Sequence, residues 1–208
     1  GEDNMRGGSG DDLLVSGAGG GFLAGDAGND TLIGGDDAEL ILGGSGDDSI
    51  EGGGGDDVIG ADVGNDTMFG GAGNDDLDGG TGVDLVTGEG GDDRFIVTSV
   101  DHGDSVTGGE TDETTGDTLD LTGAGAVSVE LTGFEAGLVT AAGGAVLSFS
   151  EIERFDLGAG NDSFVGNANG DSVNAGAGDD VLFGGNGGAD SLSGEDGDDT
   201  ISGGNDRD

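Results

Sequence analysis

The stretch Gly43-Gly44-Ser45-Gly46-Asp47-Asp48-Ser49-Ile50-Glu51 contains the pattern that decides the fold. Small residues fill its first places, an acid occupies place six, and an apolar residue occupies place eight. This nine-residue block repeats ten times without a break over residues 7–96. Place eight is apolar in all ten blocks, and place six is acidic in nine, with Gly21 as the exception. Neither a helix nor a β-hairpin has a period that repeats both the acid at place six and the apolar residue at place eight.

A second array of the same block begins near Leu157, after a middle part in which the period lengthens. In that middle part Asp104-Ser105-Val106 and Asp117-Thr118-Leu119 keep the order acid, small, apolar, and alternating apolar residues over 127–155 indicate short strands. We therefore predict a first array at 1–96, irregular β coils at 97–156 and a second array at 157–208. We expect the middle part to continue the same stack, with a ligand-binding insert as the alternative.

The composition requires a cation. The chain has a formal net charge of −42, with 46 acids, four arginines and no lysine, so it repels itself strongly. Its hydrophobic content of 31% is too low to offset the conformational entropy lost on folding, and by composition alone it would be disordered. Since the apolar residues are nevertheless strictly placed, we expect a chain that is disordered without metal and folded with it.

The block also predicts where the cation binds. Place eight points inward from a very short strand, and the glycines allow tight turns, so two blocks form one coil of a parallel solenoid. Each block then stacks on its second neighbour at about 4.8 Å, which aligns the place-six acids in two columns. Carboxylates and turn carbonyls between coils form an all-oxygen environment for a hard cation. Calcium, with 6–8 flexible ligands, suits it better than magnesium.

The pattern Gly-Gly-x-Gly-x-Asp-x-apolar-x resembles the calcium-binding nonapeptide of the RTX (repeats-in-toxin, haemolysin-type) family. The resemblance implies an all-β fold, a right-handed parallel β-roll (a β-solenoid) with two nonapeptide repeats per coil and calcium between turns. It also implies a secreted protein that is exported by a type I secretion system and folds on meeting extracellular calcium. The chain begins and stops inside a block, so we expect it to be part of a larger parent polypeptide.

The resemblance also assigns metal ligands. In the family, place-six aspartates and turn carbonyls hold each ion. Here these are Asp12, Asp30, Asp48, Asp66, Asp84, Asp57, Asp75, Asp93, Asp162, Asp171, Asp180, Asp190, Asp199 and Asp208, with Gly10, Gly28, Gly46, Gly64, Gly82, Gly55, Gly73, Gly160 and Gly178. We expect weak or empty sites beside Gly21 and Glu39, and the extra residue before Asp190 distorts one block. The remaining gaps predict roughly ten calcium ions.

The sequence lacks the residues that nucleic-acid binding, membrane insertion or catalysis would need. There is no basic patch for nucleic acid, no cysteine, and no apolar stretch near the roughly 20 residues of a membrane span. His102 is the only histidine, and the zinc motif His-Glu-x-x-His and the nucleophile motif Gly-x-Ser-x-Gly are both missing. We therefore predict a calcium-binding module that is not an enzyme.

Two alternatives for the working role stay open. The module supports the secretion and stability of a larger effector, or it is the solenoid of an extracellular adhesin or surface-layer protein. Glycan binding on 97–156 is a further possibility within the second. We expect Phe134, Phe149 and Phe155 to seal the middle coils, whereas an exposed phenylalanine there would favour a ligand surface.

Overall fold

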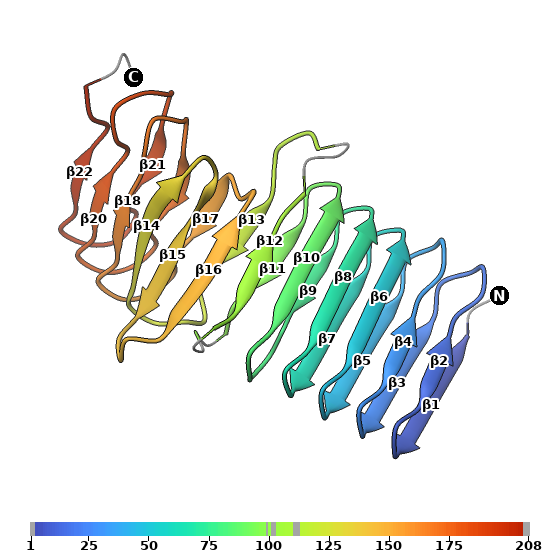
Figure 1. Ribbon diagram of the computed structural model, residues 1–208. Coiled ribbons are helices and arrows are strands. Elements are labelled where there is room, and N and C mark those ends of the chain that lie inside the picture. Colours follow the sequence, from blue (N-terminus) through green and yellow to red (C-terminus); the bar gives the residue numbers. More distant parts are fainter. Residues whose placement is uncertain (1–2, 99, 101–102, 110–112, 206–208) are drawn as a thin grey trace.

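A computed structural model describes residues 3–98, 100, 103–109 and 113–205, and shows a β-solenoid of about 11 turns built from two facing sheets (Figure 1). The described residues form strands and turns and contain no helix. Outside residues 127–150, each coil contributes one strand to each sheet, so consecutive strands alternate between the sheets. The chain is therefore all-β, as the period predicts.

The first sheet has ten strands, and every neighbouring pair in it is parallel. Its strands, in spatial order, are β1 (Asn4–Ser9), β3 (Phe22–Ala27), β5 (Leu40–Ser45), β7 (Val58–Val63), β9 (Asp76–Asp78), β11 (Arg94–Ile96), β13 (Thr118–Asp120), β17 (Arg154–Asp156), β19 (Ser172–Asn174) and β21 (Ser191–Ser193).

The second sheet has twelve strands and is parallel except at one insertion. Its strands, in spatial order, are β2 (Leu13–Val15), β4 (Thr31–Ile33), β6 (Ser49–Gly54), β8 (Thr67–Ala72), β10 (Leu85–Gly90), β12 (Ser105–Thr107), β16 (Val146–Ser150), β15 (Ala136–Ala141), β14 (Val127–Gly133), β18 (Ser163–Val165), β20 (Val181–Phe183) and β22 (Thr200–Ser202).

The strand register confirms that two blocks make one coil. Leu14 pairs with Leu32 in the second sheet, and Ile41 pairs with Ile59 in the first. Partners in the first array are thus two blocks apart, and every place-eight residue lies against a place-eight residue of the next coil. Identical places therefore stack in columns along the whole array.

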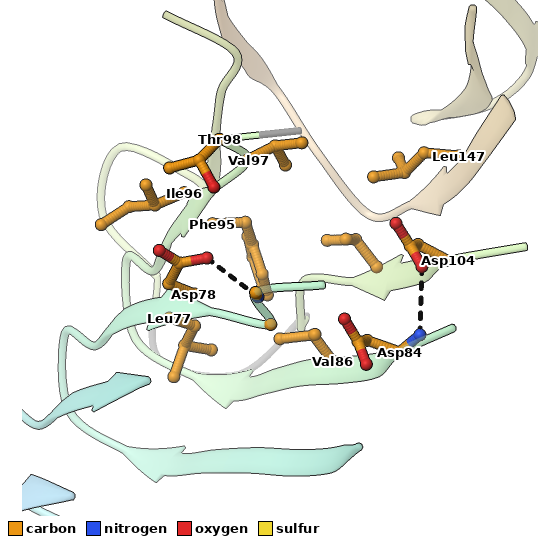
Figure 2. Close-up of a pocket in the computed structure, with 13 residues that line it drawn as sticks. Leu77, Asp78, Asp84, Val86, Phe95, Ile96, Val97, Thr98, Asp104 and Leu147 are labelled. Carbon is orange, nitrogen blue, oxygen red and sulfur yellow. Dashed lines mark hydrogen bonds between the residues drawn. The ribbon is translucent and has the colours of Figure 1, made fainter. Parts of the chain in front are cut away.

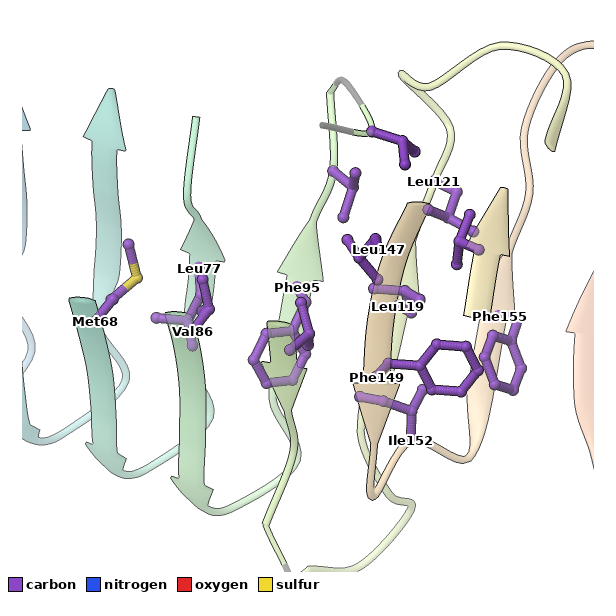
Figure 3. Packing of buried hydrophobic residues seen from close by; sticks show 14 of the residues in the cluster. Met68, Leu77, Val86, Phe95, Leu119, Leu121, Leu147, Phe149, Ile152 and Phe155 are labelled. Carbon is purple, nitrogen blue, oxygen red and sulfur yellow. The ribbon is translucent and has the colours of Figure 1, made fainter. Parts of the chain in front are cut away.

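The core is the narrow space between the two sheets, and place eight fills it. All ten place-eight residues of the first array are buried, from Leu14 to Phe95. In the second array Phe164, Val173 and Leu182 are buried, whereas Ile201 on the last strand β22 is 47% exposed. Figure 3 shows this column continuing from Met68 through Phe95 to the larger side chains of the middle part. Place seven points outward, as Leu13 at 68% exposure shows.

The middle part continues both sheets but does not form only parallel coils. Strands β12, β13, β16 and β17 extend the stack, whereas β14, β15 and β16 form an antiparallel meander inside the second sheet. The meander is a feature that the prediction of irregular β coils over 97–156 did not include. Alternation revealed the strands, but it does not specify whether neighbours run parallel or antiparallel.

Two of the three middle phenylalanines behave as expected. Phe155 lies with its ring centroid 5.3 Å from Phe149 in an edge-on contact and 5.2 Å from Phe164, and all three rings are buried (Figure 3). Phe134, in contrast, is 71% exposed in the turn between β14 and β15, so the expectation that it seals a coil was wrong. His102 lies outside the described residues.

The insertion makes the second sheet longer than the first. β17 pairs directly with β19 in the first sheet, but β16 and β18 in the second sheet are separated by β15 and β14. The two extra strands form a wedge between the coil of β16 and β17 and the coil of β18 and β19 (Figure 1).

Candidate cation sites between the coils

Most place-six aspartates tie two coils together with one of their oxygens. The backbone N–H of Asp30 donates to Oδ1 of Asp48 at 2.7 Å, and the N–H of Asp48 donates to Oδ1 of Asp66 at 2.7 Å. On the other side, the N–H of Asp57 donates to Oδ1 of Asp75 at 2.8 Å. The same bond recurs in the second array, where Asp162 N–H donates to Asp180 at 2.8 Å. The two predicted columns are thus hydrogen-bonded ladders.

The second carboxylate oxygen of these residues has no protein partner. A buried Oδ2 without a hydrogen bond is found in Asp12, Asp30, Asp48, Asp57, Asp66, Asp75, Asp93, Asp117, Asp162, Asp171, Asp180 and Asp190. Asp120 is equally buried, at 3% exposure, but its oxygens accept hydrogen bonds from Arg94 and from Thr122. Buried carboxylate oxygens normally have a partner, so one orphan in coil after coil indicates a ligand in the gaps.

Burial makes these carboxylates hard to ionise without a cation. The pKa of Asp57, Asp66 and Asp93 is raised to about 7, mainly by burial and also by negative neighbours, while a backbone hydrogen bond to each carboxylate partly opposes the shift. Burial is also the main cause that raises the pKa of Asp75 and Asp171 to about 6. A bound cation would favour the ionised form at each position.

Turn carbonyls line the gaps beside the carboxylates. A Cβ placed on Gly52, at place one, would lie 2.3 Å from the carbonyl oxygen of Gly70 in the next coil and 2.5 Å from Oδ2 of Asp57. At Gly70 the corresponding atoms are the carbonyl oxygen of Gly88 at 2.9 Å and Oδ2 of Asp75 at 2.4 Å. The missing side chain at place one therefore leaves room that is surrounded by oxygen.

The place-four glycines also stack closely, with the carbonyl oxygen of one coil against the glycine of the next. A Cβ on Gly64 would lie 1.8 Å from the carbonyl oxygen of Gly46, and one on Gly73 would lie 2.1 Å from that of Gly55. In the same way, the carbonyl oxygen of the first glycine lies against the second in the pairs Gly10 and Gly28, Gly28 and Gly46, Gly64 and Gly82, and Gly160 and Gly178. All nine place-four glycines assigned from the sequence have positive φ. The backbone turns that aim these oxygens are open to glycine and strained for other residues.

These residues fit a hard divalent cation. The gaps beside Asp57 and Asp75 each combine a buried carboxylate oxygen without a partner with a carbonyl oxygen of the next coil, so the donors seen there are all oxygen. Calcium prefers such oxygen sets and tolerates flexible geometry, whereas softer metals prefer histidine or thiolate.

Two blocks of the first array lack aspartate at place six, and their residues Gly21 and Glu39 differ structurally. Gly21 leaves its place without a carboxylate. Glu39 is 4% exposed and lies in the column: its Oε2 accepts the N–H of Gly35 at 3.0 Å, and its Oε1 has no partner. The extra residue before Asp190 is accommodated, because Asp171 N–H still donates to Asp190 Oδ1 at 3.1 Å. Asp208 lies outside the described residues.

Both columns extend beyond the array that the sequence delimits. Asp84 N–H donates to Oδ1 of Asp104 at 3.0 Å (Figure 2), Asp93 N–H donates to Asp117 at 2.7 Å, and Asp117 N–H donates to Glu153 at 2.7 Å. None of the three acceptors was assigned as a ligand. The sequence does carry a signal, since each precedes an apolar residue by two places, as place six does.

The column that contains Asp104 then stops. Val106 pairs with Phe149, so Leu147 occupies the place opposite Asp104 on the next strand, as Figure 2 shows. On the far side of the meander the N–H of Val127 donates to Oδ1 of Asp162 at 2.7 Å. Val127 thus takes the place that an aspartate holds elsewhere in the ladder. An apolar interruption thus separates the two arrays on this side.

Place five forms a second ladder that the sequence did not reveal. The N–H of Asn29 donates to Oδ1 of Asp11 at 2.9 Å, and the N–H of Asp47 donates to the Asn29 side chain at 3.0 Å. These place-five side chains are exposed, and each accepts a backbone N–H from the following coil. Place-six side chains, in contrast, accept a backbone N–H from the preceding coil. The paired acids that recur in the turns therefore hold coils together in both directions.

The comparison with known families agrees with this architecture. The chain matches the RTX calcium-binding nonapeptide repeat over residues 1–32, 15–50, 33–68, 69–97, 156–188 and 185–208, which together leave only the middle part unmatched. No curated protein matches the chain. Among the described residues no helix has the length and hydropathy needed to cross a membrane. Repeats of this family bind calcium and are structural, not typically catalytic. Matched over more than half of its length, the chain belongs to the RTX calcium-binding nonapeptide repeat family.

Proposed function

We propose that this roll binds calcium in the gaps between successive coils, through the place-six aspartates and the place-four glycine carbonyls. The orphan oxygen carries the proposal: one buried carboxylate oxygen in coil after coil lacks a protein partner and faces carbonyl oxygens of the next coil. A cation in the gap supplies the missing interaction for all of these oxygens at once.

Calcium binding and folding are expected to be one event. Roughly ten divalent ions would cancel about half of the negative charge, which otherwise opposes compaction. Extracellular modules bind calcium with dissociation constants of roughly 10⁻⁴–10⁻³ M. Since each coil contacts only its neighbours, folding then spreads cooperatively from coil to coil.

The proposed biological role is that of a secreted folding module in a larger protein. RTX repeat proteins are typically secreted, and a chain that stays unfolded at low calcium is suited to export through a type I secretion system. The alternative is that the roll is itself the working surface of an adhesin or surface-layer protein. A catalytic domain next to this segment in the full-length protein favours the first role, and long further repeats favour the second.

Circular dichroism with and without millimolar calcium tests the coupling. We expect β structure to appear cooperatively when calcium is added and to disappear when chelator is added. A chain that keeps its β structure in chelator would contradict coupled folding.

The ligand set is tested by changing Asp48→Ala together with Asp66→Ala. Each loses its ladder bond and its orphan oxygen, so the variant should need more calcium to fold and should bind fewer ions. The matched control is Glu51→Ala with Glu130→Ala, which removes the same charge from two exposed positions. Equal calcium titrations of the two double variants would rule out the assigned ligands.

One observation favours a second candidate function, glycan binding on 97–156. Phe134 is 71% exposed in the turn between β14 and β15, and an exposed apolar surface can mark a ligand-binding site. The test is calcium-dependent retention on immobilised saccharides by the chain and by Phe134→Ala. Phe183→Ala is the control, since Phe183 is also exposed, at 43%, but lies on β20 in the second array. Retention that is equal in all three proteins, or absent from all, would reject this candidate.

A further inference from the structure

The turn that leads into β13 is longer than the turns of the repeats and carries an additional acid. Asp93 and Asp117 are consecutive in their ladder but lie 24 residues apart in the chain, against 18 within the first array. The side chain of Asp92 holds the end of this turn, because its Oδ1 accepts the N–H groups of Thr114, Thr115 and Gly116 at 2.8, 2.9 and 3.0 Å. Glu113 directly precedes the residues that are held.

This turn brings three carboxylates together. One oxygen from each of Glu113, Asp117 and Glu153 lies within 4.8 Å of the other two. Asp117 is the centre of the group: it is fully buried, its Oδ1 accepts the N–H of Asp93, and its own N–H donates to Glu153 Oε2. A regular gap has place-six acids from two successive coils, so Glu113 is a third acid.

A second observation points to a ligand at this position. Oδ2 of Asp117 is buried and has no hydrogen-bond partner. A Cβ placed on Gly108 would lie 2.0 Å from this oxygen and 1.9 Å from the carbonyl oxygen of Glu151. Gly52 has the same relation to Asp57 Oδ2 and the Gly70 carbonyl in the first array. Gly108 therefore corresponds to a place-one glycine, and the oxygen-lined room of a repeat gap is reproduced outside the matched repeats.

We propose that Glu113, Asp117 and Glu153, with the carbonyl of Glu151, form a calcium site at the seam between the first array and the middle part. All the donors are oxygen, which suits a hard cation, and three carboxylates give this site more charge than a gap with two. The inference rests on the proposed function for the choice of calcium. It adds a site in 98–155, the part that the family does not match.

The charge at this position supports the assignment. The pKa of Asp117 is raised to about 8, mainly by burial and also by the charges of Asp93, Glu113 and Glu153, against the opposing effect of the hydrogen bond from Asp93 N–H. Three acids at this distance therefore require either a cation or a shared proton. The two possibilities differ in whether a metal ion is lost when one acid is neutralised.

Native mass spectrometry of the chain in calcium alone counts the bound ions. Glu113→Gln and Glu153→Gln keep the size of the side chain and remove one charge each. We expect each variant to bind one ion fewer than the unchanged chain, and Glu130→Gln, an exposed acid on β14, to bind the same number. An unchanged count in both site variants would overturn the inference and leave the proposed function standing. No bound calcium in the unchanged chain would overturn both.

A crystal of the unchanged chain grown with calcium gives a measurement that does not depend on how the variants fold. The anomalous signal of calcium should show a peak among the three carboxylates in addition to peaks in the repeat gaps. Peaks in the gaps together with no peak beside Asp117 would overturn the inference.

Discussion

Asp47 and Asp48 are neighbours in the chain but bind opposite neighbours in the roll. Oδ1 of Asp47 accepts the N–H of Asn65 in the following coil at 2.8 Å, whereas Oδ1 of Asp48 accepts the N–H of Asp30 in the preceding coil at 2.7 Å. Asp47 is exposed and Asp48 is 3% exposed with an orphan Oδ2. The two acids of one turn therefore differ: Asp47 joins its coil to the next, and Asp48 joins its coil to the preceding one and also has the orphan oxygen of the proposed cation site.

This difference predicts unequal effects of removing one charge at places five and six. Asp57→Asn keeps an oxygen for the ladder bond from Glu39 N–H but loses the charge in the gap, so we expect fewer bound ions and a higher calcium midpoint for folding. Asp56→Asn keeps the exposed bond from Asn74 N–H and should leave both values unchanged. Isothermal titration calorimetry measures both quantities. Similar losses in the two variants would show that net charge alone governs calcium binding.

The raised pKa values predict opposite effects of acid with and without calcium. Asp57, Asp66 and Asp93 have a pKa of about 7 in the calcium-free roll, above the ordinary value of 3.8 that they regain when unfolded. The calcium-free roll thus gains stability as pH falls through about 7 towards about 4, and loses it as pH rises. Calcium must displace these protons, so its affinity should fall as the buffer changes from about pH 8 to about pH 6. Circular dichroism in chelator and calcium titrations at both pH values check the two trends. An affinity that does not change with pH would contradict proton competition.

The buried column predicts a large difference between adjacent residues on β7. Ile59 is 1% exposed and Val58 is 48% exposed. Ile59→Ala should lower the free energy of unfolding by roughly 2–5 kcal/mol because it opens a cavity between the sheets. Val58→Ala should change it by no more than about 0.5 kcal/mol. Urea unfolding in saturating calcium measures both. Similar values for the two would mean that the space between the sheets is not a packed core.

Close stacking at place four predicts that a methyl group is not tolerated there. Gly82 has φ of 137°, and a Cβ on it would lie 1.6 Å from the carbonyl oxygen of Gly64. Gly8 has φ of 102°, and a Cβ on it would meet nothing within 4 Å. Gly8→Ala should therefore cost only the left-handed backbone strain, roughly 1–2 kcal/mol, and Gly82→Ala should cost more and reduce calcium binding. Thermal unfolding with and without calcium separates the two effects. Equal losses in both variants would show that the distance between coils adjusts to a side chain.

The sequence predicts most of this fold because its period fixes the register. Place eight identifies the core residues from Leu14 to Phe95, and place six identifies the acids of the two ladders. The middle part is less predictable, because an apolar alternation such as that of Val127 and Val129 shows which face is buried but not which strand lies beside it. The direction of pairing in the meander depends on how the turns of 124–145 fold.

The unassigned acids show the same limit. Asp104, Asp117 and Glu153 carry the local signature of place six, but their spacing of 20, 24 and 36 residues from their ladder partners is set by loops. A fixed period cannot place them, whereas hydrogen bonds across the coils do. Glu113 carries no repeat signature, and it lies beside Asp117 next to a turn end whose N–H groups Asp92 accepts.

The meander of β14 to β16 gives the molecule an elbow. Two strands present in only one sheet lengthen that side by roughly 10 Å, so the axis of the stack must turn towards the shorter sheet. The outer edge of this elbow lacks the row of acids, because Leu147 and Val127 occupy the corresponding places, while the inner side keeps such a row through Asp117, Glu153 and Asp171. The row of acids therefore continues from one arm into the other along one side only. We expect the proposed calcium-dependent folding to be interrupted most easily at this joint between the arms.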